Sequence, residues 1–124
     1  SGFIDKDGYF INEKYSDKEN LKTLSSKVFG WKENSRNTLS KIFNFQKNNA
    51  IEFVIINFSE NGFLTLEEKS LKTILLGFNP KIIETQLQII SDLKIQLKGN
   101  KILDKIDNID LTDPKNAKIK VFKP

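Results

Sequence analysis

The apolar positions of this chain follow a strand-like period in some segments and a helix-like period in others. Residues 51–58 are mostly β-branched and aromatic, which predicts a strand with both faces largely apolar. Residues 59–62 end in Asn-Gly, a strong signal for a hairpin turn, and residues 63–66 begin the returning strand. Residues 3–11 predict another hairpin, because apolar positions flank an Asp-Lys-Asp-Gly turn sequence.

Two segments predict amphipathic helices. The first covers roughly residues 34–47, where Asn34-Ser35 offers an N-cap and apolar side chains recur at helical spacing. The second covers residues 80–98, where Asn79 can cap the first turn and Pro80 suits the first helical position. The apolar stripe of this second helix consists of Ile83, Leu87, Ile90, Leu93 and Leu97.

Two further segments stay open on the pattern alone. Residues 16–30 contain the capping box Ser16-x-x-Glu19 and apolar residues on one helical face, so a short helix and an irregular loop both fit. Residues 65–76 begin with helix-forming residues, but then alternate in a strand-like way from Leu71 onward. Short runs of this kind fit either a helix or strands.

The last part of the chain predicts two strands, near residues 106–111 and 117–122, joined by a turn at Pro114. The order of elements is then a hairpin, a helix, several strands, a helix and two strands, with no internal repeat. This order is typical of a single α+β domain over residues 1–124. We expect a mostly antiparallel sheet with two main helices packed on one face.

The final strand is amphipathic and rich in lysine. Its alternation directs one set of side chains inward, namely Ala117, Ile119 and Val121. The other set faces solvent or a partner and comprises Lys118, Lys120 and Phe122. Such a strand fits a docking edge for another strand, and it equally fits an edge whose lysines prevent aggregation.

The residue composition narrows the chemistry that the chain can perform. It contains neither cysteine nor histidine, which excludes disulfides, thiol catalysis, Ser-His pairs and zinc sites of the usual kind. Aspartates recur at positions 104, 107, 110 and 113, but they fall partly in strand and turn, with lysines among them. We therefore expect no catalytic residues, no metal site and no cofactor.

The net charge is +4 at pH 7 and is carried almost entirely by lysine, with Arg36 the only arginine. Nucleic-acid readers favour arginine, so a solvated lysine surface is the better explanation. A basic module that binds nucleic acid or an anionic surface stands as the second hypothesis. No run is long enough to cross a membrane. Since the chain does not begin with methionine, we interpret it as part of a longer protein, with Ser1-Gly2 a cloning remnant.

The order and spacing of several short motifs resemble the extracytoplasmic β-domain of the bacterial cell-division family FtsQ, also called DivIB. The motifs are, in chain order, Ile4-Asp5-Lys6-Asp7-Gly8, Leu64-Thr65-Leu66, Leu76-Gly77, the helix over residues 80–98, and Ile109-Asp110-Leu111. Together they span essentially the whole chain. The family usually has an arginine directly after the last motif, where this chain has Thr112.

This resemblance implies that residues 63–76 form two strands rather than a helix. It also implies a non-enzymatic scaffold of the division machinery, anchored in the cytoplasmic membrane by a segment outside this chain. The β-domain would then lie on the extracytoplasmic face at the division site and bind FtsB-like and FtsL-like proteins. In the family a partner adds a strand to the last strand of the domain. The predicted partner-binding residues are Ala117, Lys118, Ile119, Lys120, Val121 and Phe122, with Asp110 and Thr112 beside them.

Overall fold

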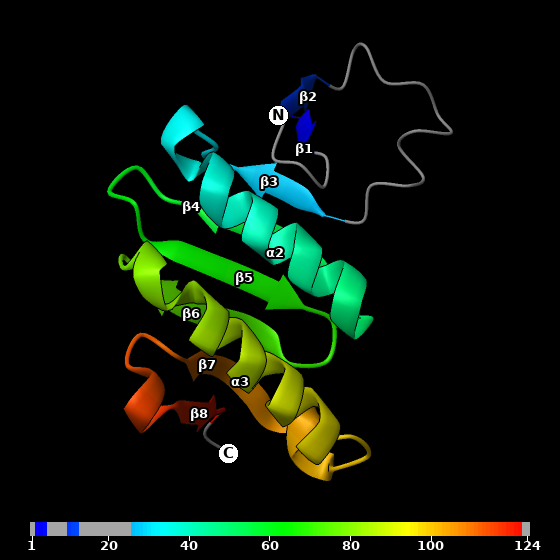
Figure 1. The fold of residues 1–124 in the computed structure, drawn as a ribbon. Coiled ribbons are helices and arrows are strands. Elements are labelled where there is room, and N and C mark those ends of the chain that lie inside the picture. The colour runs from blue at the N-terminus through cyan, green and yellow to red at the C-terminus, as the bar shows by residue number, and fades with distance from the viewer. Residues whose placement is uncertain (1, 5–9, 13–25, 123–124) are drawn as a thin grey trace.

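A computed structural model of the chain describes residues 2–4, 10–12 and 26–122 (Figure 1). The first elements are β1 (Gly2–Ile4), β2 (Phe10–Asn12), β3 (Lys27–Phe29), the 3₁₀ turn η2 (Glu33–Ser35), α2 (Arg36–Asn49) and β4 (Phe53–Phe58). They are followed by β5 (Leu64–Glu68), β6 (Lys72–Gly77), η3 (Pro80–Ile82) and α3 (Ile83–Gln96). The last elements are η4 (Lys101–Lys105), β7 (Ile106–Asp110), η5 (Pro114–Asn116) and β8 (Lys118–Val121).

The main sheet has six strands in the order β3-β4-β5-β6-β7-β8, and it is mixed. β3 pairs parallel to β4, and β6 pairs parallel to β7. The other neighbouring pairs are antiparallel. The predicted α+β class is confirmed, whereas the expectation of a mostly antiparallel sheet holds only in part. The reason is that each main helix is a crossover between two parallel strands, and a parallel pair needs such a long connection.

The order strand, helix, strand, strand occurs twice along the described chain. β3, α2, β4 and β5 form the first unit, and β6, α3, β7 and β8 form the second. In each unit a glycine with positive φ, Gly30 or Gly77, stands at the end of the first strand. A 3₁₀ turn and an α-helix of 14 residues then follow. The two units thus repeat the same order of elements. The hydrophobic pattern of the sequence did not reveal this repeat.

Both main helices lie on the same face of the sheet, as expected (Figure 1). They run side by side, and Lys41 Nζ of α2 lies 3.6 Å from Glu84 Oε1 of α3. Each helix turns its apolar stripe toward the sheet, so that the hydrophobic core forms between the two layers. The largest fully buried side chains are Phe53, Leu39, Ile42, Ile56, Leu66, Leu71, Ile74, Leu76, Ile83, Leu87 and Ile90.

The helix ends follow local chemistry only in part. α2 runs to Asn49, past the predicted end at residue 47, and stops where Ala50 adopts a left-handed conformation with φ of 52°. Ser35 stands at the N-cap of α2 as predicted, but its side chain makes no capping hydrogen bond. Asn79 does cap the next helical segment, because its Oδ1 accepts a hydrogen bond of 3.0 Å from the Lys81 N–H.

The segments that the pattern left open are resolved in part. Residues 64–77 form β5, a turn and β6, which confirms two strands and excludes a helix. Val28 lies in strand β3 rather than in a helix or a loop. The capping box at residues 16–19 lies outside the described residues. β1 and β2 pair antiparallel, as expected for the hairpin predicted over residues 3–11. The turn between them lies outside the described residues.

Candidate functional site

Strand β8 is an edge of the main sheet. It pairs with β7 in an antiparallel register that places Ile119 opposite Ile109 and Lys118 opposite Asp110. On its other side it meets no strand in the part of the chain that the structure describes. An edge of this kind presents backbone N–H and C=O groups to which another strand can bind.

The direction of each backbone group along β8 follows from one hydrogen bond. The N–H of Phe122 donates to the carbonyl of Lys105 at 2.9 Å, so it faces β7. Backbone groups alternate along a strand, and the bulge in this pair lies on β7. Lys120 therefore also directs its N–H toward β7, whereas Ile119 and Val121 direct theirs to the open side. A proline that probes the open side consequently belongs at one of these two positions and not at Lys120.

The side chains of β8 are less buried than the alternation predicts. Ile119 is half-buried against the core, but Ala117 is exposed and Val121 is 46% exposed. The prediction that Ala117, Ile119 and Val121 all pack inward is therefore wrong for Ala117 and Val121. The reason is that α3 lies over β6 and β7, and β8 lies beyond the layer that the helices form (Figure 1). Lys118 and Lys120 are both exposed, as predicted.

Phe122 adds apolar surface beside this edge. Its side chain is 62% exposed, and by alternation with Ile119 it lies on the sheet face opposite the helices. Phe122, Val54, Thr73 and Asp107 are among the residues that line a hollow of about 480 Å³. Val54 is itself 47% exposed. The end of β8 thus combines an open backbone edge with exposed apolar side chains, a combination found at docking surfaces.

Asp110 and Thr112 form a polar turn at the far end of the β7–β8 pair. Asp110 Oδ1 accepts hydrogen bonds from the Thr112 hydroxyl at 2.6 Å and from the Thr112 N–H at 3.0 Å. These bonds, with the positive charges of Lys120 and Lys118, lower the pKa of Asp110. Thr112 also lies against Gly77, where an added Cβ would be 3.2 Å from the threonine methyl. Both side chains are engaged within the turn, and Asp110 faces the lysines of β8.

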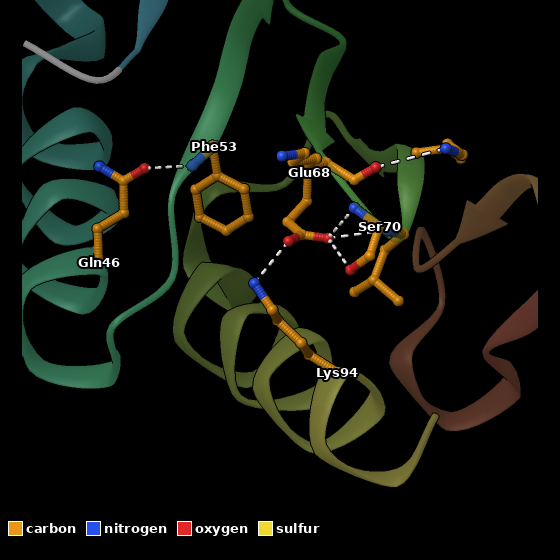
Figure 2. A network of polar contacts seen from close by, with 8 residues as sticks. Gln46, Phe53, Glu68, Ser70 and Lys94 are labelled. Carbon is orange, nitrogen blue, oxygen red and sulfur yellow. Dashed lines mark hydrogen bonds and ion pairs between the residues drawn. The ribbon is translucent and has the colours of Figure 1, made fainter. Parts of the chain in front are cut away.

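A buried charged network lies at the end of the sheet where both helices finish (Figure 2). The Glu68 side chain is only 2% exposed, and its Oε1 lies 2.6 Å from Lys94 Nζ. Its Oε2 accepts hydrogen bonds from the Ser70 N–H at 2.9 Å, the Leu71 N–H at 2.8 Å and the Ser70 hydroxyl at 2.8 Å. Burial alone would raise the pKa of Glu68, but the contacts with Lys94, Leu71 and Ser70 bring it below its ordinary value.

Gln46 fixes α2 to the same end of the sheet. Its Oε1 accepts a hydrogen bond of 2.7 Å from the Phe53 N–H at the start of β4 (Figure 2). Phe53 in turn pairs with Glu68 across the two strands. Both oxygens of the Glu68 carboxylate have partners, so this network holds the helices on the sheet. Sequence reasoning missed it, because glutamine, glutamate and lysine are typical of surfaces.

Within residues 2–4, 10–12 and 26–122, no group of three or more potential metal-ligating side chains lies together. No helix in that part of the chain is long and apolar enough to cross a membrane. No family model matches the chain, and no curated protein matches it. The β8 edge, with its exposed apolar end and its lysines, is the candidate functional site, and it coincides with the partner-binding strand predicted from the sequence.

Proposed function

We propose that this domain is a non-enzymatic binding module whose β8 edge receives a strand of another protein. The observation that carries the proposal is an edge strand that, among the described residues, pairs on one side only and ends in exposed Val121 and Phe122. Backbone hydrogen bonds to the open side provide affinity, and side-chain contacts provide selectivity. Lys118 and Lys120 favour a partner strand that carries acidic residues.

The proposed partners are FtsB-like and FtsL-like division proteins. The support is the FtsQ/DivIB-like order of motifs in the sequence. Two features that the resemblance implies also agree with it, namely two strands in place of a helix over residues 63–76 and a last strand at the edge of the sheet. The domain then acts as a scaffold on the extracytoplasmic face of the bacterial cytoplasmic membrane, with a membrane anchor outside this chain.

The test is a binding titration with the FtsB-like protein of the same organism, using two proline variants. Val121→Pro removes an N–H that faces the open side, so we expect it to retain the fold and lose binding. Lys120→Pro removes an N–H that faces β7, so we expect it to lower the melting temperature of the domain itself. Val121→Ala is the matched control, because it shortens the side chain and keeps the N–H.

Two side-chain variants test selectivity at the same edge. Phe122→Ala should weaken binding by about 1–2 kcal/mol, because it removes an exposed aromatic anchor without touching the core. Lys120→Glu should weaken binding to an acidic strand and leave the melting temperature unchanged. If Val121→Pro, Phe122→Ala and Lys120→Glu all bind like the parent domain, the docking edge lies elsewhere.

The second hypothesis, binding to nucleic acid or an anionic surface, gives a different result in these variants. Lys118→Glu and Lys120→Glu would then weaken binding to DNA or anionic vesicles, and the loss would depend on salt concentration. Val121→Pro would leave that binding unchanged, because a backbone donor at a sheet edge makes little contribution to charge attraction. This pattern would replace the strand-docking proposal.

A further inference from the structure

A second hollow, of about 200 Å³, lies at the end of the fold where both helices begin. The start of α2, the end of β4, the end of β6 and the first turns of α3 all contribute to its walls. Phe58, Leu64, Leu76 and Ile83 make much of the lining apolar. None of its lining residues belongs to β8, so the hollow is separate from the proposed docking edge.

Three nearly buried polar side chains line this hollow, and each has an oxygen that lacks a hydrogen-bond partner among the described residues. Ser35 and Thr38 are each 9% exposed, and neither hydroxyl bonds to any described residue. Gln86 is 1% exposed, and its Oε1 receives no hydrogen bond from the described residues. None of these three oxygens is among the fully enclosed side-chain atoms that lack a partner, and all three residues line the hollow. Polar groups at such depth normally have a partner.

The orientation of the Gln86 amide is fixed by the sheet. Its Nε2 donates to the carbonyl of Leu76 at 2.7 Å and to the carbonyl of Leu111 at 2.9 Å. Both amide hydrogens are used, so the side chain can offer a ligand only its acceptor oxygen Oε1. A ligand in the hollow must therefore offer a donor to Gln86, while the hydroxyls of Ser35 and Thr38 can donate to an acceptor on the ligand.

The uncharged lining of the hollow favours an uncharged ligand over an ion. No aspartate, glutamate, lysine or arginine is among its lining residues. A cation would lose its hydration without a carboxylate to replace it. A carboxylate or phosphate would have no cation to pair with and would place an oxygen against Gln86 Oε1. The walls match a neutral group that has a donor and an acceptor at one end and an apolar body at the other.

We infer that this hollow is a binding site for a small uncharged carboxamide. The amide N–H of the ligand donates to Gln86 Oε1, and its carbonyl accepts from Thr38 and Ser35. The carbon chain of the ligand lies against Phe58 and Ile83. The carboxamide can belong to a small molecule or to the side chain of an asparagine or glutamine in another protein.

The test uses three ligands of the same shape that differ in charge, namely propionamide, propionate and propionamidinium. Each is titrated into the whole ¹⁵N-labelled chain, and the backbone amide signals of residues that line the hollow are followed by NMR. We expect saturable shifts with propionamide and none with the two ions. Equal or tighter binding of either ion would overturn the inference, as would the absence of shifts with all three, which means that water alone fills the hollow.

A pair of threonine variants connects the binding to the named atoms. Thr38→Val keeps the shape of the side chain and removes its hydroxyl, so propionamide should bind about fivefold more weakly, as expected for one hydrogen bond of about 1 kcal/mol. Thr85→Val is the matched control, since Thr85 is exposed on α3 and does not line the hollow. Unchanged binding in Thr38→Val would refute the assignment. Should Thr38→Val lower the melting temperature, Ser35→Ala provides the same measurement.

A last comparison separates the two sources of the carboxamide. N-acetylglutamine methylamide presents the group as a peptide side chain, and propionamide presents it as a free small molecule. Tighter binding of the glutamine derivative identifies a partner protein as the source, and tighter binding of propionamide identifies a small molecule. Both results support the carboxamide site, whereas equal binding of the matched N-acetylglutamate methylamide, which also carries backbone amides, would rule out a glutamine side chain as the source.

Discussion

Replacing Glu68 by glutamine tests the charged network that holds the helices on the sheet. Glutamine keeps the shape of the side chain and one acceptor oxygen, so the N–H groups of Ser70 and Leu71 retain a partner. It removes the negative charge that Lys94 contacts at 2.6 Å. We expect Glu68→Gln to lower the free energy of unfolding by about 3 kcal/mol.

The magnitude follows from the contacts. A hydrogen bond to a charged acceptor contributes about 1.5–3 kcal/mol, against about 0.5–1.5 kcal/mol for a neutral one, so the two backbone bonds lose about 1 kcal/mol each. The amide group of glutamine then faces Lys94 Nζ, and loss of the ion pair adds about 1 kcal/mol. This last contribution is small because Lys94 is 38% exposed and its charge is screened by water.

The assay is denaturant unfolding at neutral pH with three variants. Lys94→Met removes the ion pair and leaves Glu68 Oε1 without its partner, so it should cost about 1–3 kcal/mol. Glu67→Gln is the matched control, because Glu67 is the exposed neighbour of Glu68, and its change should stay within about 0.5 kcal/mol. The reasoning is refuted if Glu68→Gln unfolds within about 0.5 kcal/mol of the parent, or if Glu67→Gln costs as much as Glu68→Gln.

Three further predictions concern pH, a glycine and a helix-to-sheet bond. Because the folded-state pKa of Glu68 is lowered, its contribution is present above the ordinary value near 4.5 and is lost as pH falls through the folded pKa. The difference in unfolding free energy between the parent and Glu68→Gln should therefore narrow in denaturant titrations below about pH 4.5, and a widening difference would contradict this. Gly30→Ala should cost more than about 2 kcal/mol in thermal unfolding, because φ is +69° and the new Cβ would lie 1.8 Å from the Phe58 carbonyl oxygen. Gly62→Ala, with φ of +91° and no atom within 4 Å, should cost only about 1 kcal/mol, and equal losses at both glycines would show that the close approach is unimportant. Gln46→Leu removes the acceptor of a backbone N–H of β4 and should cost about 1–3 kcal/mol, while Gln46→Glu restores an acceptor and should recover part of the loss in the same melt.

The elements with strong local signals were predictable from the sequence. Asn79 accepts its capping bond from Lys81, and Gly62 donates to the Ser59 carbonyl at 2.9 Å in the turn that Asn-Gly predicts. These features depend on residues a few positions apart, so a short stretch of sequence contains all of the chemistry that decides them. The two strands over residues 64–77 needed more than the alternation, because helix-forming residues at their start fit a helix equally well.

The parallel pairings and the burial of β8 were not predictable from local pattern. Lys27 of β3 pairs with Ile55 of β4 across the whole of α2, and no residue near either position specifies that neighbour. The exposure of Val121 has the same origin, because it depends on how far α3 extends over the sheet. An alternating pattern distinguishes two faces of a strand, but it does not tell whether another layer covers one of them.

The buried polar residues could be predicted only as exceptions to the apolar stripe of a helix. Gln86 lies between Ile83 and Ile90 at helical spacing, on the side of the helix that an apolar residue normally occupies. A glutamine at such a position indicates a partner in the core, here the carbonyls of Leu76 and Leu111. The sequence contains no information on which carbonyls these are, since residue 111 reaches Gln86 only through the β6–β7 pairing.

The repeated topology explains why β8 has an open side. In the first unit, β5 pairs antiparallel with β4 on one side and with β6, the first strand of the next unit, on the other. In the second unit, β8 takes the place of β5 and pairs with β7 as β5 pairs with β4. A counterpart of β6 beside β8 does not occur among the described residues. A strand that extends the repeat at β8 would run antiparallel to it, as β6 does to β5, and would use the outward N–H groups of Ile119 and Val121. The proposed partner strand thus occupies the position that a third unit would fill.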